Sequence, residues 1–155
     1  MNTEHFLHAI GELAASLGWQ LRSFTRGQEQ VAVVALDHDP SFEQVLWVHD
    51  AGQASVRCLL VCRGKVPSER EAAILELCAR INEDLLFGCA EYGFDDRTVA
   101  FRDSMQLSYG PIAGLVASTT QRLLQLGSQY APAVRAALAG SSAVEAMKCA
   151  RDAHE

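Results

Sequence analysis

Residues 67–94 read PSEREAAILELCARINEDLLFGCAEYGF, and this stretch decides the fold. Ser68 and Glu71 have the spacing of a capping box, with Pro67 just before, so a helix is predicted to begin here. Its apolar side chains recur at helical spacing, at Ile74, Leu77, Cys78, Ile81 and Leu85. The pattern then changes to a hairpin, with strands at 87–94 and 98–107 around an Asp95-Asp96 turn.

Upstream of this helix, four strands are predicted in one block. They cover Trp19–Phe24, Glu29–Leu36, Gln44–Val48 and Ser55–Cys62. A helix over Glu4–Leu17 precedes them, because apolar residues recur at helical spacing and Gly18 ends the run. The segment Asp37-His38-Asp39-Pro40 resembles a ligand cluster, but its residue types are those that a strand-connecting turn prefers.

Downstream of the hairpin, Gly110-Pro111 begins a third helix, because proline is accepted in the first turn. This helix either ends near Gly127 or continues past Pro132 to Leu138, with a break or kink between those two residues. Ser142 and Glu145 form a second capping box, which predicts a short final helix ending near Ala153.

The predicted order is α-β-β-β-β-α-β-β-α-α. Strands that come in hairpin-like groups indicate an α+β domain with an antiparallel sheet and helices packed on one side. We expect one domain over residues 1–140 and a C-terminal helical extension over 141–155.

Charge excludes several partners. The 155 residues carry 13 Lys+Arg against 19 Asp+Glu, a net charge of −6, and the basic residues are scattered. Nucleic acids and anionic membranes require clustered bases, so neither is an expected partner. The N-terminus lacks the features of a signal peptide, and the apolar runs are too short for a membrane helix, so a cytoplasmic protein is expected.

The charge is unevenly distributed. Residues 1–103 carry 9 Lys+Arg and 16 Asp+Glu, a net −7, whereas no acidic residue occurs from Ser104 to Val144. A long helix with so few charges either packs across its own sheet or forms a subunit or partner interface. The same alternative applies to the strand Val45-Leu46-Trp47-Val48, which is apolar on both faces.

No motif for catalysis, cofactor binding or metal binding is recognised. There is no phosphate-binding loop, dinucleotide motif or nucleophile elbow. His5 and His8 could share a metal, but a solvated helix end explains them, and Asp95-Asp96 suits a hairpin tip. The five cysteines lack a CxxC pair and are expected to be small buried hydrophobes in a reducing compartment. Cys58 and Cys62 lie four residues apart on one predicted strand, which is too far for a disulfide between them.

The second half of the chain resembles the YbjN family of bacterial proteins. The resemblance rests on Val66-Pro67 before the helix, Asn82 near its end, and Gly88 before the hairpin. Val99–Arg102 fits the second hairpin strand, and Tyr130–Val134 with Gly140 fits the terminal helix. The resemblance covers about residues 66–140 and implies a sensory transduction regulator.

That family is similar in fold to class I type III secretion chaperones, which are acidic cytoplasmic homodimers with the order α-β-β-β-α-β-β-α. Because this chain has four strand candidates in its first block, one of them is expected to be a strand split by a bulge.

The resemblance implies a non-enzymatic, dimeric, chaperone-like or regulatory protein that binds a protein partner. The alternatives are a type III secretion chaperone holding an extended effector segment, and a small-molecule-binding protein or enzyme with an unrecognised site. A partner or dimer surface is expected at Val45, Trp47, Leu115, Leu123 and Tyr130.

Overall fold

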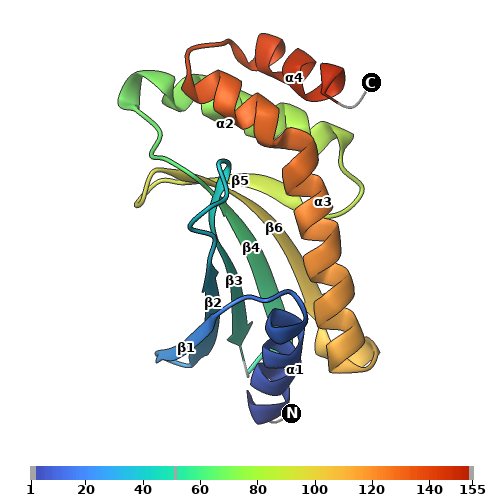
Figure 1. The fold of residues 1–155 in the computed structure, drawn as a ribbon. Helices are drawn as coiled ribbons and strands as arrows, with labels where there is room; N and C mark the ends of the chain where they lie inside the picture. The colour runs from blue at the N-terminus through green and yellow to red at the C-terminus, as the bar shows by residue number, and fades with distance from the viewer. Residues whose placement is uncertain (1–2, 51, 154–155) are drawn as a thin grey trace.

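The computed structural model describes residues 3–50 and 52–153 as an α+β fold (Figure 1). The elements are α1 (Thr3–Ser16), β1 (Leu21–Arg26), β2 (Glu29–Ala35), β3 (Phe42–Asp50), β4 (Ser55–Cys62), the 3₁₀ turn η1 (Ser68–Arg70), α2 (Glu71–Asp84), β5 (Cys89–Gly93), β6 (Thr98–Gln106), the 3₁₀ turn η2 (Leu107–Tyr109), α3 (Ile112–Leu138) and α4 (Ala143–Asp152). The predicted fold class and element order are confirmed.

All six strands form one antiparallel sheet in the order β1-β2-β3-β4-β6-β5. The expectation that one of the first four strands is a bulge-split piece is wrong. β1 and β2 pair along their length, from Leu21 with Val34 to Arg26 with Glu29, as the two arms of a hairpin. A register irregularity does occur, but within β3, between Phe42 and Gln44.

The helices cover one face of this sheet, as predicted (Figure 1). α3 crosses β4 and β6, α1 lies beside α3 and β2, α2 packs on β5, and α4 packs on α2 and α3. The core lies between the sheet and the helices, and its largest fully buried side chains include Trp47, Phe6, Phe101 and Leu60. Residues of α4 belong to the same core as the rest of the chain, namely Ala143, Ala146, Met147 and Ala150.

α3 is one helix of 27 residues that continues through Pro132, so it does not end at Gly127. Figure 1 shows its ribbon changing direction in the second half, which agrees with the predicted kink. Proline lacks the N–H of a helical hydrogen bond and crowds the preceding turn, which bends a helix. Gly127 has a different role, because a Cβ atom there would lie 2.3 Å from Leu60 Cδ2 and 2.9 Å from Phe42 Cζ.

Of the two predicted capping boxes, only the second forms. The Ser142 hydroxyl accepts a hydrogen bond from the Glu145 N–H, and the Glu145 carboxylate accepts one from the Ser142 N–H at 2.9 Å. The hydrogen bonds from the Ser142 backbone and hydroxyl hold the pKa of Glu145 below its usual value. Ser68 instead begins η1, and no side chain caps α2.

Glu71 of the first predicted box binds a tertiary partner instead. The Glu71 carboxylate accepts a hydrogen bond from the Tyr92 hydroxyl at 3.0 Å. The neighbouring Arg70 donates to the Ala137 carbonyl at 2.8 Å, in the last turn of α3, and to the Ser141 carbonyl, in the connection between α3 and α4. This link therefore ties the start of α2 to the end of α3.

Candidate functional site

The face of the sheet without helices forms a shallow hollow of about 370 Å³, which we call the sheet trough. Its apolar floor consists of Leu46, Val48, Leu59, Val61 and Ala100. Val48, Val61 and Ala100 are buried, yet they lie outside the main core cluster because they point away from the helices. β3 is therefore apolar on both faces because one face meets the core and the other lines this trough.

Several charged side chains on this face pair with one another. Arg26 and Arg57 both bind the carboxylate of Glu29, Arg26 at 2.7 Å. Arg102 binds Glu91 at 2.8 Å. The trough therefore combines an apolar floor with charged side chains, some of which are paired with one another, and this combination suits a contact surface.

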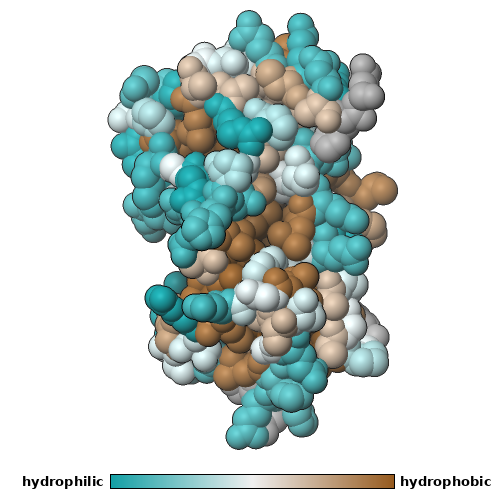
Figure 2. Space-filling view, viewed as in Figure 1, coloured by the Kyte–Doolittle hydropathy of each residue, from teal (hydrophilic) through white to brown (hydrophobic). Residues whose placement is uncertain are grey.

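A second hollow, the central groove, lies between the β2–β3 loop and α3 and has a volume of about 460 Å³. Figure 2 shows apolar side chains gathered in the middle of the molecule, on the face that is turned to the viewer. The apolar residues lining the groove are Trp19, Leu36, Pro40, Phe42, Leu124, Ala131 and Pro132.

The polar groups beside the central groove hold the loop in place. One Asp39 carboxylate oxygen accepts hydrogen bonds from the backbone N–H groups of Ser41 and Phe42, at 2.8 and 2.9 Å, so this segment is the turn that was predicted. Arg63 donates to the carbonyl oxygens of Leu36, Asp39 and Phe42 at 2.8–2.9 Å. Because these groups serve the loop, the central groove is an apolar surface groove over a filled core.

The connection between α2 and β5 carries the Leu86–Phe87 patch. Leu86 is 93% exposed and Phe87 is 71% exposed, the two largest values among the exposed large apolar residues of the described chain. The Arg122 guanidinium lies 5.9 Å from the centre of the Phe87 ring and binds Asp103 at 2.8 Å. Beside the patch is a hollow of about 300 Å³ that Leu123 and Leu126 also line.

The residues predicted to form a partner surface lie mostly in the core. Val45, Trp47, Leu123 and Tyr130 are buried, and Leu115 is half-buried against the core. The Trp47 indole N–H donates to the Thr120 hydroxyl of α3 at 3.0 Å. Of the two alternatives for α3, the structure shows packing across its own sheet; the exposed residues of α3 are mainly small or uncharged. The open apolar surfaces of the described chain include the trough, the central groove and the Leu86–Phe87 patch.

All five cysteines are free thiols, but only Cys58, Cys62 and Cys78 are buried as expected. Burial raises the pKa of Cys58 and of Cys62 to about 12, and that of Cys78 to about 11. These three thiols therefore stay protonated near neutral pH, and a protonated thiol is a poor nucleophile. Cys89 is half-buried beside Arg102, and Cys149 is exposed.

The metal and acid–base candidates lie in structural positions. His8 lies 3.4 Å from Glu12 on the exposed side of α1, and His5 is exposed on the same helix. Asp96 accepts hydrogen bonds from the Thr98 N–H and hydroxyl in the β5–β6 turn. Across residues 3–50 and 52–153, no three His, Cys, Asp or Glu side chains gather closely enough to hold a metal ion.

Asn82 and Gly88, quoted above for the family resemblance, join α2 to the hairpin. The Asn82 amide donates to the Ala90 carbonyl at 3.0 Å and accepts from the Ala90 N–H at 2.7 Å, so it mimics a strand partner for β5. Gly88 has φ +73°, and a Cβ atom there would lie 3.0 Å from the Arg102 carbonyl oxygen. Each residue therefore has a backbone function that other residue types fulfil poorly.

We expect Asn82→Ala to lower the free energy of unfolding by about 1–2 kcal/mol, because both polar backbone groups of the buried Ala90 lose their partner. The loss should occur although alanine is the better helix former. Urea unfolding measures it, with Glu83→Ala on the same exposed helix end as the matched control. Equal stability of the two variants would show that water replaces the amide without cost.

No helix in the described part of the chain is long and apolar enough to cross a membrane. Residues 7–136 match the model of the YbjN family, whose description is "Putative bacterial sensory transduction regulator". No curated protein and no solved structure matches the chain. The match spans α1 to most of α3, and its description names a regulator rather than a reaction. The chain therefore belongs to the YbjN family.

Proposed function

We propose that this protein is a non-catalytic regulatory module that binds other proteins and works as a homodimer in bacterial signalling or regulation. The observation that carries the proposal is the Leu86–Phe87 patch, where two adjacent large apolar side chains are 93% and 71% exposed. Exposed apolar clusters of this kind mark protein contacts. The family membership supports a regulatory role. Free thiols on every described cysteine are compatible with a reducing compartment, and we assign the protein to the cytoplasm.

The second copy is the occupant that best fits this patch. A protruding leucine and a hollow of about 300 Å³ lie side by side on one surface. In a two-fold interface each copy presents the same surface, so the Leu86 of each subunit can enter the hollow of the other. Asp84, Asp103 and Arg122 also line the hollow, but Arg122 already binds Asp103 within its own chain, so the apolar side chains carry the proposed contact.

Leu86→Asp tests the dimer. We expect the unmodified protein to sediment with twice the chain mass of 16.8 kDa, and the variant to dissociate at least tenfold more readily. The reason is that each subunit would bury an aspartate beside Leu123 and Leu126 of the hollow, next to Asp84 and Asp103. Sedimentation equilibrium over a range of concentrations measures both masses.

Leu17→Asp is the matched control, because it makes the same substitution at an exposed leucine just after α1, outside the residues that line the hollow. This control should keep the dimer. A monomer at high concentration in the unmodified protein would overturn the dimer, and dissociation by both variants would place the contact elsewhere.

A further inference from the structure

β1 is an open edge of the sheet. It pairs with β2 on one side only, and five of its six residues are exposed (Figure 1). The β1–β2 hairpin is closed by the pair Arg26 and Glu29. In an antiparallel pair, every second residue directs its N–H and C=O groups away from the partner strand. Counted from the closing pair, the residues of β1 that point away from β2 in this way are Thr25, Ser23 and Leu21. The edge therefore offers backbone donors and acceptors to a further strand.

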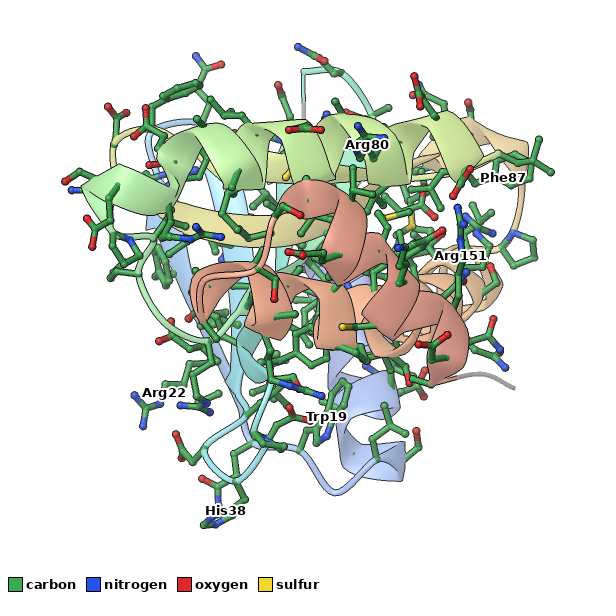
Figure 3. The ribbon with its side chains drawn as sticks, turned by 90° about the horizontal axis from the view of Figure 1, so that it is seen from above. Trp19, Arg22, His38, Arg80, Phe87 and Arg151 are labelled. Carbon is green, nitrogen blue, oxygen red and sulfur yellow. The ribbon has the colours of Figure 1, made fainter. Side chains whose placement is uncertain are left out.

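The side chains of β1 on the trough side form a regular pattern. Arg22, Phe24 and Arg26 alternate along the strand on this face, and Phe24 is 50% exposed. Figure 3 shows Arg22 extending outward from the sheet. No ion pair forms at Arg22 among the described residues, whereas Arg26 shares Glu29 with Arg57. An excess of positive charge thus lies at this edge of a chain whose net charge is −6.

We propose that β1 binds an extended segment of a partner protein that adds to the sheet as a seventh strand and carries acidic, apolar and acidic side chains at every second residue. Its acids face Arg22 and Arg26, and its apolar side chain packs on Phe24. The inference rests on the proposed protein-binding function and names the chemistry of the partner. Backbone pairing supplies affinity in such strand addition, and the alternate side chains supply selectivity.

A second copy of this chain fits the edge poorly. Two antiparallel β1 strands centred on Phe24 would place Arg22 of each copy opposite Arg26 of the other. A parallel pair in register would place each arginine opposite itself. Like charges directly across a strand pair are destabilising, so the pattern opposes self-pairing and favours an acidic partner.

Simple protection of the edge does not account for the whole pattern. Charged residues are a common device against unwanted strand pairing. A half-exposed aromatic ring between the two arginines opposes that purpose, because it offers an apolar contact at the centre of the edge. The Leu86–Phe87 patch lies on the opposite side of the molecule from Arg22 (Figure 3), so a dimer through the patch leaves both β1 edges open.

The experiment uses the full chain labelled with ¹⁵N and two capped synthetic peptides of equal composition. One reads Thr-Glu-Thr-Val-Thr-Glu-Thr, with the valine and both acids on one face. The other reads Thr-Glu-Val-Thr-Thr-Glu-Thr, which moves only the valine to the opposite face. We expect the first peptide to shift the amide resonances of Leu21, Ser23 and Thr25 and to bind about fivefold more tightly than the second.

Reversing the charge of the two β1 arginines gives a second test of the edge site. The double variant Arg22→Glu/Arg26→Glu should bind the acidic peptide about tenfold more weakly and should bind the equivalent peptide with lysine in place of glutamate. The matched control is Arg80→Glu/Arg151→Glu, which changes the net charge equally at two arginines away from β1, the half-buried Arg80 and the exposed Arg151 (Figure 3). It should bind the acidic peptide like the unmodified protein.

Equal affinity for the two peptides, or amide shifts confined to the trough or the central groove, would overturn the edge site. A change in oligomeric mass in Arg22→Glu/Arg26→Glu would identify a second copy as the occupant of β1. No binding at millimolar peptide by a protein that sediments as a dimer would overturn the edge site and leave the proposed function standing. Peptide binding by a protein that sediments as a monomer would reject the proposed homodimer and support the edge site.

Discussion

Replacing Trp47 by alanine is expected to lower the free energy of unfolding by about 3–5 kcal/mol, measured by urea denaturation. The indole is fully buried between the sheet and the helices, where it lies 6.5 Å from the Trp19 ring. Its removal leaves a cavity and takes away the donor that binds the Thr120 hydroxyl. The result tests a core role directly, because a surface residue would cost far less.

Trp47→Phe is the matched variant for this position. It keeps an aromatic ring but removes the N–H, so we expect a smaller loss of about 1–2 kcal/mol. Both variants should leave the dimer mass unchanged under conditions where they are folded. An alanine variant with unchanged stability and a lost dimer would return Trp47 to the predicted partner surface.

Gly127→Ala is the second large effect, an expected loss of about 1–3 kcal/mol in the free energy of unfolding. The added methyl carbon would lie 2.3 Å from Leu60 Cδ2 and 2.9 Å from the Phe42 ring. Both neighbours are buried, so neither can move away freely. The clash should outweigh the gain of roughly 1 kcal/mol that alanine brings to a helix.

Gly114→Ala in the same helix is the control, because nothing lies within 4 Å of a Cβ atom there. This variant should be as stable as the unmodified protein or more stable, by up to about 1 kcal/mol. Thermal and urea unfolding of the pair separate packing from helix propensity. Equal gains in both variants would mean that α3 can shift away from the sheet at Gly127.

The two capping-box sequences show where prediction from local pattern succeeds and fails. Ser142 and Glu145 form the box because both are exposed and have no competing partner. Ser68 and Glu71 have the same spacing, but the Tyr92 hydroxyl binds Glu71. That competitor comes from β5, 21 residues along the chain, and no local pattern reveals it.

Helix and strand positions were predictable because they depend on periodicity within a few residues. The block of four strands, the hairpin after α2 and the final helix all follow from such local patterns, and they match the structure within a few residues. The partner surface was not predictable in the same way. β3 has apolar residues on both faces, and its sequence does not say which face meets the helices.

The sequence by itself determined the α+β class, the order of the elements, the acidic charge and the family motif at Asn82 and Gly88. Only the tertiary structure decided that Trp47 lies in the core, that Gly127 is a packing site, and that β1 and Leu86–Phe87 remain open. The physical reason is that burial depends on contacts between residues distant in the chain. Those contacts exist only once the sheet has formed and the helices have covered one of its faces.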